Sequence, residues 1–159
     1  MYKRLFFTIT AGVIGLVALV DTASAEPAGQ KLLGLLNGSE EVDANGAPNA
    51  GDPDAAGYVV ATVDGKAGKV CVTEFKVAAV DGTVTLFHIH KEVAGKNGPI
   101  VVDFVPLLPS GIGCVQVANN RRLLNDIKRA PSKFYFNVHS TPNFPAGAIR
   151  GQIRHLARN

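Results

Sequence analysis

The sequence has few of the features that mark catalysis, metal-cluster assembly or nucleic-acid binding. Its 159 residues include only two cysteines, which do not form a Cys-x-x-Cys motif, and this argues against a dithiol redox site or a thiolate zinc site. It contains no G-x-S-x-G nucleophile motif and no glycine-rich phosphate loop ahead of a helix. The formal net charge is only +3, which predicts no general affinity for nucleic acid.

Long apolar runs are confined to the N-terminus. Lys3 and Arg4 precede a nearly continuous apolar stretch, and a small-x-small cleavage motif ends at Ala25. We therefore expect a signal peptide over residues 1–25 and one mature domain over residues 26–159, secreted or held in a periplasm. The alternative is an uncleaved N-terminal anchor. No second apolar stretch of membrane-spanning length follows, so no span is expected after cleavage.

Charge is distributed unevenly along the expected mature chain. Residues 26–120 hold six lysines and eleven acidic residues, net −5, whereas residues 121–159 hold eight basic residues and one acidic residue, net +7. Such asymmetry is consistent with a basic face for an anionic partner such as a polysaccharide or a membrane surface. The interpretation we favour is that the two parts interleave in the fold and neutralise each other.

The two cysteines are Cys71 and Cys114. In an oxidising compartment an even number of thiols tends to pair, so we expect one structural disulfide; the alternative is two buried thiols. Closing a loop of this length stabilises a protein by about 4 kcal/mol in the chain-entropy model.

Short alternating segments bounded by Gly, Pro, Asn and Asp predict an all-β protein. One helix is expected over residues 120–129, with an Asn N-cap, three apolar residues on one face and Pro131 as its stop. We expect an antiparallel, Greek-key-like β-sandwich. The long segment 37–56 is predicted to be a solvated loop. The expected strands are 31–36, 57–63, 69–78, 83–91, 100–105, 114–118, 133–140 and 148–154.

Three histidines form the candidate site. His88 and His90 are two residues apart in a predicted strand and so share one face, and His139 ends another strand. Neutral imidazole is a good ligand for copper or zinc. The sequence leaves two interpretations open, a metal site and histidines that only complete the packing, and the second is favoured. The candidates for a fourth donor are water, Glu92, Asp103 and Asn137.

Arg150 lies between Ile149 and Gly151 in the last predicted strand. Its guanidinium is expected to form a structural ion pair with Glu92 or Asp103; the alternative is bidentate binding of an anionic ligand. A weaker hypothesis is a hydrolase or lyase in which a histidine acts as the base and Arg150 orients an anion.

Five segments together resemble the CHRD domain family, which is named after chordin. They are Asn37–Val42, Phe87–His90, Gly95–Val101, Tyr135–Thr141 and Phe144–Ile153. The resemblance covers nearly the whole mature chain and implies a single-domain secreted member with an immunoglobulin-like or superoxide-dismutase-like sandwich. It also implies a cysteine pair, since bacterial members often carry one.

The resemblance implies binding more than catalysis. Chordin itself binds extracellular growth factors. The His-x-His pair before a glycine-rich loop is similar to that of copper/zinc superoxide dismutase, but the histidine-rich zinc loop of that enzyme is missing. We therefore expect a non-enzymatic extracytoplasmic binding or structural module, whose partner is an unidentified protein, polysaccharide or metal ion. The alternative is a copper- or zinc-binding protein that uses His88, His90 and His139.

Overall fold

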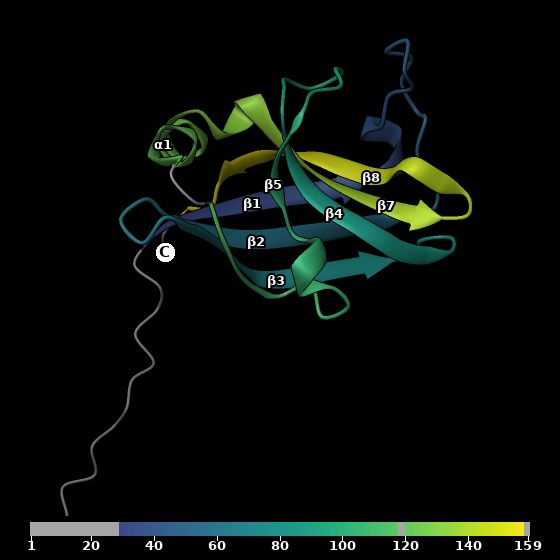
Figure 1. The fold of residues 1–159 in the computed structure, drawn as a ribbon. Coiled ribbons are helices and arrows are strands. Elements are labelled where there is room, and N and C mark those ends of the chain that lie inside the picture. Colours follow the sequence, from purple (N-terminus) through teal and green to yellow (C-terminus); the bar gives the residue numbers. More distant parts are fainter. Residues whose placement is uncertain (1–28, 118–119, 158–159) are drawn as a thin grey trace, which may run out of the picture.

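The described residues fold as one antiparallel sheet of eight strands in the order β5-β4-β7-β8-β1-β2-β3-β6 (Figure 1). The fold is taken from a computed structural model, which describes residues 29–117 and 120–157. The expected signal peptide, residues 1–25, lies outside the described residues. The strands are β1 (Gln30–Asn37), β2 (Ala56–Asp64), β3 (Lys69–Ala78), β4 (Thr83–Lys91), β5 (Ile100–Asp103), β6 (Gly113–Gln116), β7 (Phe134–Thr141) and β8 (Phe144–His155).

The sheet folds over on itself into two facing layers. Strands β4 and β3 are separated in the sheet order by β7, β8, β1 and β2, yet the ring centroids of Phe87 on β4 and Phe75 on β3 lie 4.6 Å apart. Phe87 also packs on Phe104 and Phe136, at 4.7 and 6.1 Å between centroids. The chain crosses between the two layers after β3, β5 and β6, so the expected Greek-key-like sandwich is confirmed.

The helix α1 (Arg121–Arg129) lies beside the sheet (Figure 1). The Asn120 side chain caps it by accepting a hydrogen bond from the Leu123 amide at 3.0 Å, and its buried face consists of Leu123, Leu124 and Ile127. The helix expected over residues 120–129 is thus confirmed. In the part of the chain that the structure describes, no helix is both long and apolar enough to cross a membrane.

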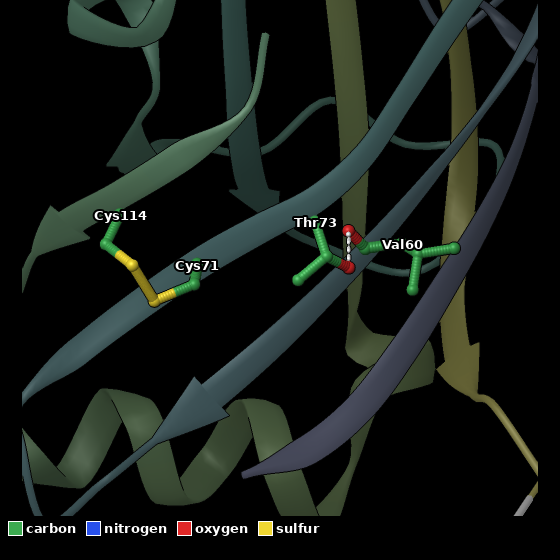
Figure 2. The surroundings of a disulfide bond; sticks show 4 residues. All are labelled: Val60, Cys71, Thr73 and Cys114. Atoms are coloured by element: carbon green, nitrogen blue, oxygen red, sulfur yellow. Dashed lines mark hydrogen bonds between the residues drawn. A yellow bond between two sulfur atoms is a disulfide. The ribbon is translucent and has the colours of Figure 1, made fainter. Parts of the chain in front are cut away.

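The disulfide between Cys71 and Cys114 ties the edge strand β6 to β3 (Figure 2). The two residues are direct cross-strand partners, with their Cα atoms 3.9 Å apart. Further along β3 the ladder with β2 shifts register at Val60, and the extra residue, Thr73, donates its hydroxyl to the Val60 carbonyl at 3.2 Å. The expected disulfide is therefore present, and both cysteines lie in regular pairing rather than in loops.

Most strand boundaries differ from the sequence prediction by one or two residues, and the start of β8 and the nature of the segment 37–56 differ most. Strand β8 begins at Phe144 rather than at residue 148, because the turn after β7 is tight enough for Ser140 to pair with Phe144. The segment 37–56 is not a fully solvated loop. It carries a short 3-10 turn, Gly38–Glu40, and it buries Glu41, Val42 and Asp52. Its backbone bonds to neighbouring strands, as in the bond from the Asp52 amide to the Ala148 carbonyl at 2.8 Å.

Candidate metal centre

The outer face of β4 and β7 is polar and buried at the same time. All but the last residue of β7 are buried, so Phe134, Phe136 and Val138 face the core while the alternating Tyr135, Asn137 and His139 are covered as well. The cover comes from the loops around residues 38–52 and 92–99. The Asn97 side-chain amide fastens one loop to the other by donating to the Asp43 carbonyl at 2.9 Å.

The three predicted histidines meet on this face. Strands β4 and β7 are antiparallel neighbours, in which His88 lies opposite Asn137 and Leu86 lies opposite His139. The ring centroids lie 5.4 Å apart for His88 and His139, 5.7 Å for His88 and His90, and 6.3 Å for His90 and His139. One ring nitrogen of each histidine lies within 4.8 Å of those of the other two. All three residues are at most 8% exposed.

Contacts with carbonyl and carboxylate oxygens indicate which nitrogen of each ring carries the proton. Nδ1 of His90 lies 2.8 Å from the Gly98 carbonyl oxygen, and Nδ1 of His139 lies 3.0 Å from that of Pro145. A carbonyl only accepts, so both Nδ1 atoms must donate, and in a neutral ring Nε2 then keeps its lone pair. Nε2 of His88 faces the Asp103 carboxylate at 3.6 Å, which favours the proton on Nε2 and the lone pair on Nδ1.

The three remaining nitrogens have no partner. Nδ1 of His88 and Nε2 of His90 and His139 are buried and form no hydrogen bond with any residue in 29–117 or 120–157. Burial lowers the pKa of all three histidines, that of His88 to about 4, with His139 acting in the same direction on His88. The backbone contacts to Gly98 and Pro145 only partly oppose this shift in His90 and His139. At neutral pH the site thus presents three uncharged rings with free lone pairs.

This donor set fits a borderline divalent cation. Copper and zinc accept imidazole nitrogen at about 2.0–2.1 Å, and tetrahedral zinc places its ligands roughly 3.3 Å apart. One nitrogen from each ring lies within 4.8 Å of the other two, so binding of a tetrahedral ion requires the rings to move closer together. A carbonyl or carboxylate already stands behind each imidazole, an arrangement that holds metal-binding histidines in one tautomer and orientation.

A buried polar network adjoins the histidines. Nε of Arg150 lies 3.5 Å from Oε2 of Glu41, and Arg150 also donates to the carbonyls of Glu40 at 2.6 Å and Lys96 at 3.1 Å. Burial raises the pKa of Glu41 to about 7, although the Arg150 charge and hydrogen bonds that include one from Asn137 act against the rise. The side-chain carbonyl oxygen of Asn137 is buried and has no hydrogen-bond partner in the part of the chain that the structure describes.

A cleft of about 350 Å³ opens beside this network. Its lining includes Glu41, His90, Asn97, Tyr135 and Asn137, with small residues such as Ala146 and Gly147 around them. The Tyr135 ring stacks on His90 with centroids 4.9 Å apart, and the guanidinium carbon of Arg150 lies 4.8 Å from the same ring centroid. The cleft therefore leads from solvent to one of the three histidines.

The structure changes the interpretation of two predicted residues and adds one that the sequence did not indicate. Arg150 pairs with Glu41 rather than with Glu92 or Asp103, so its partner comes from the loop that was predicted to be solvated. Asn137 lies among the histidines, opposite His88. Glu41 was missed, because an acidic residue in a polar loop gives no sign of burial; the segment Asn37–Val42 drew notice only through its family resemblance.

Comparison with known proteins identifies the family. The sequence model of the CHRD domain matches residues 34–153, which is three quarters of the chain. The chain belongs to the CHRD domain family. No curated protein and no solved structure matches it. The matched range of this CHRD domain contains the three histidines, Glu41, Asn137, Arg150 and both cysteines.

Proposed function

We propose that this CHRD domain is a metal-binding module that acts outside the cytoplasm, with His88, His90 and His139 as ligands of one copper or zinc ion. The observation that carries the proposal is a set of three buried ring nitrogens, brought by neighbouring strands onto one face, that have no hydrogen-bond partner among the described residues. In the divalent series nitrogen sites bind Cu²⁺ most tightly, so copper is the first candidate and zinc the second.

Purely structural histidines account less well for this arrangement. A buried polar atom without a partner costs about 1–3 kcal/mol, and the cluster contains three such atoms within one small volume. Histidines that served only to fill space would be replaced by apolar side chains at no such cost. A bound cation coordinates all three nitrogens at once. It thereby removes the free-energy cost of leaving them unpartnered, and this gain contributes to its affinity.

The proposal does not include dismutase chemistry. Besides the three clustered histidines the chain has only His155, which is exposed and lies 2.7 Å from the Lys128 carbonyl through Nε2. A second, histidine-rich metal site of the superoxide dismutase type is therefore not available from this sequence. We infer binding, storage or delivery of the ion. The disulfide and the expected signal peptide support a location outside the cytoplasm.

Metal analysis of the exported protein tests the proposal. The purified protein is titrated with Cu²⁺ and, separately, Zn²⁺ by calorimetry, and bound metal is counted by mass spectrometry. We expect one ion per chain in the wild type and in the control variant His155→Ala, and none in the double variant His88→Ala/His139→Ala. Circular dichroism establishes that the double variant is folded. Stoichiometric metal retained by that folded variant rejects these ligands.

A further inference from the structure

Four cationic side chains line one groove on the side of the molecule where α1 lies. Two adjoining depressions, of about 440 and 210 Å³, share Lys91 and Asp126 among their lining residues. The first is also lined by Arg122, and the second by Arg129 and Lys133. The groove therefore runs along one flank of α1, between the helix and the end of β4.

Helical periodicity explains why these residues share the groove. Arg122, Asp126 and Arg129 are spaced by four and three residues, which places them on one helix face. The buried face of Leu123, Leu124 and Ile127 fixes the rotation of the helix against the sandwich. Lys91 is the last residue of β4, paired with Phe134, and Lys133 immediately precedes Phe134. Three separate segments thus bring their cations to one place.

The groove contains one acidic residue, Asp126, which forms no ion pair with the four cations among the described residues. Within residues 29–117 and 120–157, the side chains of Lys91, Arg122, Arg129 and Lys133 form no ion pair and no hydrogen bond. The neighbouring Lys128 differs, because it lies close enough to Asp64 to help lower the pKa of that carboxyl. The favoured interpretation of the sequence was that the basic C-terminal part and the acidic part neutralise each other. At this groove, the basic side chains are not paired with the acidic part.

We propose that this groove binds an acidic polysaccharide whose sugar units carry both carboxylate and hydroxyl groups. The four cations match the carboxylates. Asp126, in the middle of the groove, accepts hydrogen bonds from hydroxyls and repels a ligand with dense phosphate charge. Asn120 lines the groove too; its side-chain oxygen caps α1, which leaves its amide N–H groups available to sugar oxygens.

The shape and lining of the groove distinguish this ligand from two other polyanions. A concave groove accommodates a single chain, whereas a membrane surface is met by a flat or protruding basic face. Single-stranded nucleic acid is usually bound with aromatic stacking platforms, but the aromatic residue of this groove, Phe134, is 1% exposed. The site is independent of the histidine cluster, so the two proposals stand or fall separately.

Binding of an end-labelled galacturonate hexamer, followed by fluorescence polarisation at low ionic strength, tests the proposal. We expect Arg122→Gln/Arg129→Gln to weaken binding about tenfold or more, since two charge-assisted contacts are lost. The matched control Lys66→Gln/Lys76→Gln removes the same charge from exposed positions outside the groove and should change affinity less than about twofold, the scale of a screened distant charge. His88→Ala/His139→Ala should bind the hexamer as the wild type does.

Several outcomes overturn the proposal. The first is that the wild type does not bind the hexamer, and the second is that the groove and control variants are weakened equally. The third is that inorganic polyphosphate displaces the labelled hexamer at a lower concentration of negative charge than the unlabelled hexamer does. Binding to phosphatidylglycerol vesicles without binding to the hexamer also overturns it, because the groove then serves a lipid surface. Circular dichroism of both double variants shows that they are folded, so that a loss of binding reports on the groove.

Discussion

Burial changes the acid–base behaviour of single side chains around the candidate metal centre. His88, His90 and His139 are held neutral by desolvation. Glu41 is 2% exposed, and although it faces Arg150, desolvation outweighs the attraction and raises its pKa from 4.5 to about 7. Each of these residues would titrate in its ordinary range on the surface. Their altered behaviour comes from the loops that cover the polar face of β4 and β7.

The raised pKa of Glu41 predicts a specific dependence of stability on pH. Below pH 4.5 the carboxyl is protonated in both the folded and the unfolded state, so its burial costs no ionisation energy; as pH rises through 7 this advantage is lost. The difference in unfolding free energy between Glu41→Gln and the wild type should therefore change by about 3 kcal/mol in favour of the variant as pH rises from 4.5 to above 7. Urea unfolding at a series of pH values measures this difference.

The exposed neighbour Glu40 supplies the control for this measurement. Glu40→Gln should show the same dependence of unfolding free energy on pH as the wild type. In both proteins the three histidines, whose pKa values are lowered, make stability fall as pH decreases, which is opposite to the effect of Glu41. If the difference between Glu41→Gln and the wild type is the same at every pH, the buried carboxyl does not titrate as described.

The loops beside the strands supply the backbone groups that contact the histidine rings. The loop between β4 and β5 presents the Gly98 carbonyl to His90, and its Gly98 amide donates to the Tyr135 hydroxyl at 3.2 Å. Gly98 fits only because it lacks a Cβ, which would lie 2.2 Å from the Lys91 carbonyl oxygen. The same loop contains Gly95, which has a φ of +76° but open space where a Cβ would be.

Replacing Gly98 should loosen His90. We expect Gly98→Ala to move the loop, weaken the hydrogen bond to Nδ1 and lower the affinity for copper or zinc by about tenfold, the lower end of the loss when a group that orients a metal ligand is removed. The control Gly95→Ala should cost roughly 1 kcal/mol of stability through its backbone conformation and leave metal affinity unchanged. Calorimetric titration of both variants distinguishes these effects. Equal affinities would show that the Gly98 carbonyl does not orient the ligand.

The edge strand β6 depends on its covalent link to β3. It has four residues and, among the described strands, pairs with β3 alone, so the disulfide between Cys71 and Cys114 helps to hold it in place. Closure of the loop between positions 43 residues apart predicts a loss of about 4 kcal/mol in Cys71→Ala/Cys114→Ala. Denaturant unfolding measures the loss, with the reduced wild type as a second sample. An unchanged unfolding midpoint in both samples would contradict this role.

At the scale of the whole molecule, the proposed ion couples to folding. The ligands come from β4 and β7, strands near the middle of the chain and near its end, so the complete three-histidine site exists only in the folded sandwich. A ligand that binds only the folded state, at one hundred times its dissociation constant, stabilises a protein by about 3 kcal/mol. We expect that increase in unfolding free energy for the wild type with copper or zinc, and its reversal by a chelator.

The double variant His88→Ala/His139→Ala tests this coupling. Its unfolding free energy should not respond to added metal, while His155→Ala should respond as the wild type does. Equal stabilisation of all three proteins by metal would assign the effect to sites other than the cluster.

The sequence alone determined the features that depend on local periodicity and on composition. Alternating apolar residues predicted the strands, an Asn cap and Pro131 delimited the helix, and the two-residue spacing placed His88 and His90 on one face, because side chains alternate along a strand regardless of the rest of the chain. The even number of cysteines predicted the disulfide.

Only the tertiary structure decided how distant segments combine. It placed His139 beside His88 through the register of β4 and β7, and it folded the loop with Glu41 over Arg150, against the prediction of a solvated segment. Contacts between residues far apart in sequence arise from the packing of layers and the pairing of strands, which no local pattern encodes. Whether three histidines form a cluster is therefore a property of the folded sandwich.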